Sequence, residues 1–146
     1  MPDYPKRKWS RLKDYDYSTD GYYFLTICTE NRKCILSSIK TNEDRSATVE
    51  LTPYGIVADG LIRSIPGIDK YVIMPNHIHM IIHKTNGKSI ASDVRSFKGL
   101  TTKQIGKRIW QDYYHDHVIR NEEDYLIKWN YIDKNPGKWI EDEYYA

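Results

Sequence analysis

Two histidines separated by one isoleucine, His77 and His79, are the residues of this chain whose type and spacing most directly suggest chemistry. Successive side chains of a strand alternate between its faces, so both histidines point the same way, roughly 7 Å apart. Ile78 and Ile82 then point the other way, toward a core. Two imidazoles at that separation can bind one metal ion, and histidine is the commonest metal ligand. The alternative is a strand whose outer face simply carries these histidines and His83.

Farther along the chain, a tyrosine and an asparagine share one face of an expected helix. Asn121 and the three acids after it favour a helix start, because the amide caps free N–H groups and the acids suit the positive end of the dipole. At 100° per residue, Tyr131, Asn135 and Lys128 fall on the face nearly opposite the core. The core face carries Tyr125, Leu126, Trp129 and Ile132. A stripe with a phenol, an amine and an amide is a candidate site, and a half-exposed surface tyrosine is the alternative.

The surrounding residues predict the elements that must position these side chains. β-Branched and aromatic runs predict strands at 22–29, 47–51, 71–74 and 77–82. Apolar periodicity and capping residues predict helices at 53–64, 89–107 and 122–135. The polar stretch 40–46 is expected to be a loop, and 110–120 short strands or loop. This order predicts an α+β sandwich in which helices pack on one face of an antiparallel sheet.

The composition is that of an ordinary globular protein and argues against several classes. The chain has 146 residues, 40% of them hydrophobic and 29% charged, so one domain with its own core is expected. No apolar run has the length of a membrane span, and the basic N-terminus does not resemble a signal peptide. Cys28 and Cys34 form neither a disulfide framework nor paired metal knuckles, so a reducing cytoplasm is expected.

Positive charge is concentrated in two segments, although the net charge is only +2. The first segment supplies Lys6, Arg7, Lys8 and Arg11, and the second supplies Arg95, Lys98, Lys103 and Lys107. Such clusters favour a polyanion partner such as nucleic acid, whose phosphates these residues are predicted to bind. Solvated basic faces without a partner are the alternative.

These motifs occur in an order that resembles a known family. The run Met-Pro-Asn-His-Ile-His at 74–79 resembles the histidine–hydrophobic–histidine motif of HUH enzymes. The stretch 110–136 is similar to the single-tyrosine transposases, and most similar to the branch associated with repetitive extragenic palindromes (REP). Its matching residues include Trp110, Tyr114, His117, Tyr131, Asn135 and Pro136. The opening 11–28 also resembles that branch, so the similarity spans about residues 7–139.

The resemblance implies a metal-dependent DNA transposase or strand transferase with a ferredoxin-like or RRM-like fold. By this resemblance, His77 and His79 would be ligands of Mg²⁺ or Mn²⁺, and Asn135 would complete the metal shell. Tyr131 would be the nucleophile. The implied substrate is single-stranded DNA that carries a hairpin, cut through a covalent 5′-phosphotyrosine without ATP.

Two rival functions share the same motifs. One is a non-catalytic relative that binds a DNA hairpin and keeps the fold only as a scaffold. The other is a metal-dependent nuclease that uses the histidines with water as nucleophile. In each case residues 1–146 form one domain, with 1–20 as a basic aromatic arm and 121–136 as the helix that carries the tyrosine. The resemblance also implies a bacterial cytoplasmic protein on the nucleoid, either a monomer or a homodimer.

Overall fold

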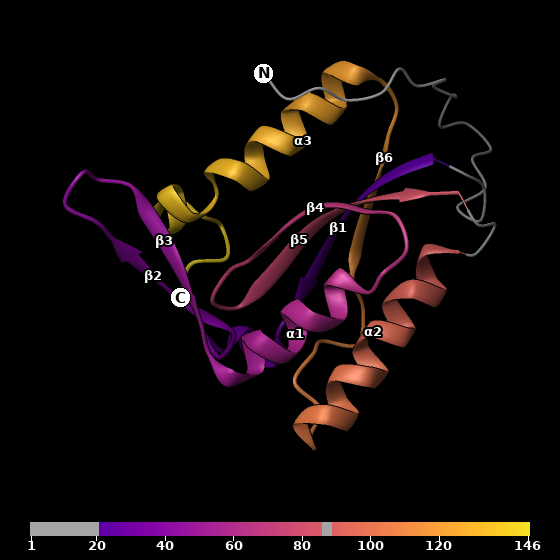
Figure 1. Ribbon diagram of the computed structural model, residues 1–146, viewed down its shortest axis with the longest axis horizontal. Coiled ribbons are helices and arrows are strands. Elements are labelled where there is room, and N and C mark those ends of the chain that lie inside the picture. Colours follow the sequence, from indigo (N-terminus) through magenta and orange to yellow (C-terminus); the bar gives the residue numbers. More distant parts are fainter. Residues whose placement is uncertain (1–20, 86–88) are drawn as a thin grey trace.

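The computed structural model describes residues 21–85 and 89–146, and its centre is a four-stranded antiparallel sheet with the order β4-β5-β1-β6 (Figure 1). The strands are β1 (Gly21–Cys28), β4 (Ile68–Ile73), β5 (His77–Lys84) and β6 (His115–Ile119). With α1 (Pro53–Arg63) and α2 (Ile90–Ile105), they follow one another as β1-α1-β4-β5-α2-β6. This is the ferredoxin-like arrangement, so the predicted α+β fold with an antiparallel sheet is confirmed.

The α-helices begin where the sequence predicts, because each has a capping side chain. Thr52 Oγ1 accepts a hydrogen bond from Gly55 N at 3.1 Å at the start of α1. Asn121 Oδ1 accepts one from Asp124 N at 2.7 Å at the start of α3 (Glu122–Lys134), and Ser89 caps α2 in the same way. These side chains satisfy amide groups that have no partner within the first helical turn.

Different helices cover the two faces of the sheet (Figure 1). On one face, α1 and α2 pack over the apolar core that includes Ile78 and Ile82 of β5. On the other face, α3 packs through Tyr125 and Ile132. The prediction of helices on one face therefore holds for α1 and α2 but not for α3. The second face also needs a cover, because it carries the apolar or aromatic residues Tyr22, Val72, Ile81 and Ile119.

A small hairpin lies between β1 and α1 in the chain, made of β2 (Ser37–Thr41) and β3 (Ala47–Leu51). The prediction of a loop at 40–46 is therefore wrong at its start, because Lys40 and Thr41 belong to β2. Most side chains of β2 are exposed and polar, so the strand lacks the apolar alternation by which a strand is predicted. Two short 3-10 turns complete the elements, η1 (Glu30–Arg32) and η2 (Pro136–Glu141).

The start of β5 is fixed by a tight turn from β4. Met74 N donates to His77 O at 2.8 Å, and Thr29 N donates to Asn76 O at 3.0 Å. Gly67, just before β4, packs against the other end of β5. Its φ is 84°, and a Cβ added there would lie 2.0 Å from His83 O. Only glycine allows so close an approach with that backbone conformation. None of the helices described in 21–85 and 89–146 has the length and apolar character to cross a membrane.

Candidate functional site

His77 and His79 lie on the face of β5 that α3 covers, and both are buried, at 0% and 2% exposure. Their ring centroids are 4.6 Å apart. The predicted shared face is confirmed, and the alternative in which an outer strand face simply carries these histidines is wrong, because both are buried. Alternation along a strand shows which side chains share a face, and it does not show whether a distant element covers that face.

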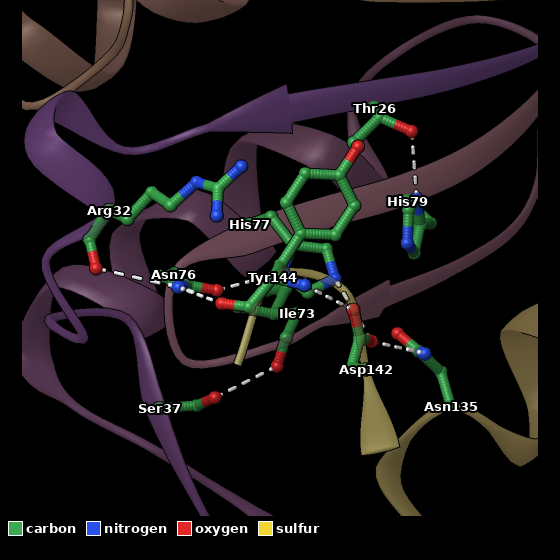
Figure 2. A network of polar contacts seen from close by, with 10 residues as sticks. All are labelled: Thr26, Arg32, Ser37, Ile73, Asn76, His77, His79, Asn135, Asp142 and Tyr144. Carbon is green, nitrogen blue, oxygen red and sulfur yellow. Dashed lines mark hydrogen bonds and ion pairs between the residues drawn. The ribbon is translucent and has the colours of Figure 1, made fainter. Parts of the chain in front are cut away.

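Each histidine is oriented by a hydrogen bond through Nδ1 (Figure 2). His77 Nδ1 lies 2.8 Å from Asn76 Oδ1, and His79 Nδ1 lies 2.9 Å from Thr26 Oγ1. The Asn76 amide is itself held, because its Nδ2 donates to Tyr144 O at 2.6 Å and Oδ1 is left to accept from His77. A neutral imidazole that donates from Nδ1 keeps its lone pair on Nε2. Outer hydrogen bonds of this kind orient metal-binding histidines in many proteins.

Three buried acceptor atoms at this place have no hydrogen-bond partner among the described residues: His77 Nε2, His79 Nε2 and Asn135 Oδ1. Asn135 follows the last turn of α3, and its Nδ2 donates to Asp142 Oδ2 at 2.8 Å. Unpaired buried polar atoms are rare in folded proteins, so a cluster of three needs an explanation. Two imidazole nitrogens and an amide oxygen all offer lone pairs, and together they fit a divalent cation.

Burial keeps both imidazole rings neutral. It lowers the pKa of His77 from 6.5 to about 4, and the nearby Asp142 carboxylate opposes this shift only in part. Burial also lowers the pKa of His79, and the adjacent His77 adds to that effect. Neutral imidazole is the form that binds metals, so both Nε2 lone pairs are available near neutral pH.

Tyr131 projects from α3 toward the same histidines. Its ring centroid lies 5.1 Å from that of His79, and its residue is 40% exposed, so part of the phenol ring faces solvent. Burial of the rest, together with the Asp142 and Glu143 carboxylates, raises the pKa of Tyr131 to about 12. The phenol is therefore protonated at neutral pH and lies at the border between the buried acceptors and open space.

Open space adjoins Tyr131 on two sides. One cavity of about 320 Å³ is lined by residues that include His79, Lys128 and Tyr131. A second, of about 530 Å³, is lined by residues that include Tyr131, Lys134 and Lys138. Each cavity thus brings at least one ammonium group to the tyrosine. Acids line the same cavities, with Glu143 in both and Glu141 and Asp142 in the second, so a phosphodiester here would need a cation beyond these lysines.

The segment after α3 contributes residues to the site that the sequence did not reveal (Figure 2). It carries the chain back over the histidines, where Asp142 Oδ2 lies 3.8 Å from His77 Nε2. The Tyr144 ring centroid lies 4.5 Å from that of His77. Nothing in the sequence distinguishes Asp142 from the acids around it, because its importance comes only from this long-range contact.

Of the basic residues predicted to bind DNA, the four that the structure describes do not converge on this site. Those near the N-terminus lie outside the described residues: Lys6, Arg7, Lys8 and Arg11. Arg95, Lys98 and Lys103 belong to α2, with Lys107 just after it, and α2 covers the sheet face opposite the histidines. Lys98 Nζ already donates to Gln111 O at 2.7 Å. Arg95 and Lys98 line a separate cavity of about 520 Å³ on that side.

The fold and the site together define a class of protein. It is a ferredoxin-like α+β domain in which a helix-borne tyrosine faces two strand-borne histidines beside a buried amide oxygen. Such a site combines a potential nucleophile with a potential cation site, which suits transfer of a phosphodiester.

Comparison with known proteins agrees with this class. No family model matches the chain. An uncharacterized protein of Haemophilus influenzae is 32% identical over 173 residues, covering 96% of this chain and 93% of the relative. The REP-associated tyrosine transposase of Escherichia coli K12 is 30% identical over 129 residues, covering 85% of this chain and 72% of the relative. A solved structure of a REP-associated tyrosine transposase bound to a REP hairpin has a TM-score of 0.60 and 25% identity, over 94% of this chain and 74% of that chain.

The chain belongs to the family of REP-associated tyrosine transposases. The resemblance noted from its motifs is thereby confirmed. The protein is a DNA-processing enzyme of the transposase type.

Proposed function

We propose that the protein cleaves and rejoins single-stranded DNA that carries a hairpin, with Tyr131 as the nucleophile. A divalent metal ion held by His77, His79 and Asn135 would assist it. The observation that carries this proposal is the cluster of three unpartnered buried acceptors beside a tyrosine whose ring lies 5.1 Å from that of His79. A merely structural surface tyrosine would not account for those acceptors.

Mg²⁺ or Mn²⁺ is the ion proposed for this site. When bound, it would neutralise charge on the non-bridging phosphate oxygens and favour ionisation of the nearby phenol. The oxygen of Asn135 suits these hard cations, whereas the imidazoles of His77 and His79 suit softer metals better. These three ligands alone would therefore make a weak site, and oxygen atoms from DNA phosphate would strengthen it.

Tyr131 would break the strand by attacking phosphorus in line with the leaving oxygen. The bond between Tyr131 Oη and phosphorus forms while the bond from phosphorus to the 3′ oxygen breaks. The products are a 5′-phosphotyrosine and a free 3′-hydroxyl, which takes up the proton lost by the phenol. Because the covalent link conserves the phosphodiester energy, the 3′-hydroxyl of another DNA end can displace the tyrosine without ATP.

The proposal of a hairpin substrate rests on the structural neighbour, which is bound to a REP hairpin. Lys128 lines the cavity beside Tyr131 and would contact the phosphate at the cut. Arg95, Lys103 and Lys107 are exposed on the α2 side and would contact phosphates elsewhere on the hairpin.

A labelled hairpin oligonucleotide, incubated with the protein and Mn²⁺, tests this proposal. The expected product is a protein–DNA adduct that resists denaturant. Tyr131→Phe should reduce its formation by about 10³-fold or more, because no other group replaces the nucleophile. Tyr113→Phe is the matched control, since Tyr113 is an exposed tyrosine that lines neither of the two cavities beside Tyr131, and it should form the adduct normally.

The remaining outcomes separate the rival functions. Cleavage without an adduct would indicate a nuclease that uses water. Tight hairpin binding without cleavage would indicate a non-catalytic relative. Persistence of the adduct in Tyr131→Phe would overturn the assignment of the nucleophile.

A further inference from the structure

Asp142 is a carboxylate buried at the centre of the site, with a side chain only 1% exposed. Its Oδ1 accepts a hydrogen bond from Tyr144 N at 2.8 Å, and its Oδ2 accepts one from Asn135 Nδ2 at 2.8 Å. Oδ2 is also the atom that lies 3.8 Å from His77 Nε2. One oxygen of this carboxylate is therefore directed to the place where the unpartnered acceptors lie.

No lysine or arginine of the described segments 21–85 and 89–146 forms an ion pair with the Asp142 side chain. Among the described residues, its side chain has one ion-pair contact, with the His77 ring. A buried charge without a charged partner is unfavourable unless it coordinates a metal or is neutralised. One cation between Asp142 and the three unpaired acceptors would satisfy all four groups.

We propose that Asp142 is a fourth protein ligand of the metal ion, alongside His77, His79 and Asn135, and this inference rests on the metal site of the proposed function. Two ligand atoms about 2.1 Å from one ion lie about 3 Å apart at adjacent octahedral positions and about 4.2 Å apart at opposite ones. The observed separation of 3.8 Å between His77 Nε2 and Asp142 Oδ2 lies between these two values, so octahedral binding requires a small rotation of one of the two side chains. Oδ2 keeps a lone pair for the ion while it accepts from the Asn135 amide.

Contacts of the chain on both sides hold Asp142 in this position. Asn76 Nδ2 donates to Tyr144 O at 2.6 Å, and the Tyr144 ring packs against His77 with centroids 4.5 Å apart. Asn76 also orients His77, so one side chain positions a metal-binding ring and the segment that carries the carboxylate. Asp142 is therefore placed by contacts of Asn76, the residue that also orients His77 (Figure 2).

A carboxylate ligand would raise the affinity of the site for Mg²⁺ or Mn²⁺. Two imidazoles and an amide carry no charge and bind Mg²⁺ or Mn²⁺ weakly, whereas a carboxylate oxygen is the ligand these hard cations prefer. With Asp142 included, the protein binds the ion before DNA arrives. The metal site is then part of the free enzyme and is not assembled by substrate phosphate.

Titration of the full chain with Mn²⁺ alone, followed by the electron paramagnetic resonance of free Mn²⁺, tests this inference without DNA. The wild type should bind one Mn²⁺, and Asp142→Asn should bind it at least about tenfold more weakly. Asp142→Asn keeps the shape of the side chain and one acceptor oxygen, which can still accept from Tyr144 N, while an uncharged amino group replaces the other oxygen. Glu141→Gln removes the same charge from the adjacent exposed residue and should bind Mn²⁺ like the wild type.

Equal Mn²⁺ affinity in Asp142→Asn and the wild type would overturn the inference, as would a wild type that binds no Mn²⁺ without DNA. Neither result bears on whether the protein forms a covalent adduct with hairpin DNA. Conversely, loss of Mn²⁺ binding in Asp142→Asn supports the fourth ligand even if Tyr131 proves not to be the nucleophile. Thermal unfolding of the metal-free variants confirms that each one is folded.

Discussion

The rings of Tyr131 and His79 face each other between α3 and β5, with centroids 5.1 Å apart and planes inclined by 63°. The contact joins a phenol to a histidine whose Nε2 lone pair has no partner among the described residues. Because the pKa of Tyr131 is raised to about 12, the phenol must lose its proton during reaction and cannot act as a standing phenolate. The reaction rate should therefore depend on pH through the loss of this phenol proton.

Adduct formation with the hairpin should become about tenfold faster for each unit of pH between about 6 and 8. Below the pKa of a phenol, its ionised fraction increases tenfold per unit. His77, with a pKa of about 4, does not titrate in this range. Single-turnover rates at fixed Mn²⁺ would measure the slope. A rate independent of pH would contradict direct attack by the ionised phenol in the slow step.

Thr26→Val should weaken Mn²⁺ binding and slow adduct formation by about 10- to 100-fold. Thr26 Oγ1 lies 2.9 Å from His79 Nδ1, and its loss removes the hydrogen bond that orients the ring with its Nε2 lone pair toward the metal. Thr26→Ser keeps the hydroxyl and should retain most of both properties. Equal values for the valine and serine variants would show that this hydrogen bond does not position His79.

Without metal, the protein should lose stability as the pH falls from about 6.5 to about 4. The pKa of His77 is lower in the folded state than its ordinary value of 6.5, so the unfolded chain takes up the proton first. The stability that depends on neutral His77 is complete above about pH 6.5 and is lost as the pH falls to about 4. The loss amounts to about 3 kcal/mol for His77, and His79 shifts in the same direction.

Urea unfolding at pH 7 and at pH 4.5, in the presence of a chelator, measures this loss. His77→Gln removes the titrating group and should show a smaller difference between the two pH values. If the variant and the wild type lose the same free energy of unfolding, His77 does not carry the effect.

A buried ion pair joins the end of β5 to the first turn of α2. Lys84 Nζ lies 2.5 Å from Asp93 Oδ2, and the two side chains are only 1% and 10% exposed. Asp93→Ala should lower the free energy of unfolding by about 3 kcal/mol, because it leaves a buried ammonium without its partner. The double variant Lys84→Met, Asp93→Leu should lose much less, since no buried charge remains. Similar losses in the single and double variants, measured by urea unfolding, would contradict this account.

Local patterns were sufficient for much of the site. Alternation along β5 places His77 and His79 on one face whatever the rest of the chain does, because the period of a strand is two residues. The cap at Asn121 and the helical period likewise place Tyr131 and Asn135 one turn apart on α3. These relationships depend on backbone geometry within a few residues, so the sequence by itself determined them.

Only the tertiary structure determined which residues contact these side chains. The sequence alone does not show that α3 covers the histidine face of the sheet, because that follows from apolar side chains such as Tyr22 and Val72 on strands far from α3 in the chain. Thr26 reaches His79 through the register of β1 and β5, and Asp142 reaches His77 because the chain turns back after α3. Contacts between distant segments are set by how all the apolar surfaces are buried together. For that physical reason the histidines could be recognised from the sequence, whereas their burial and their neighbouring carboxylate could not.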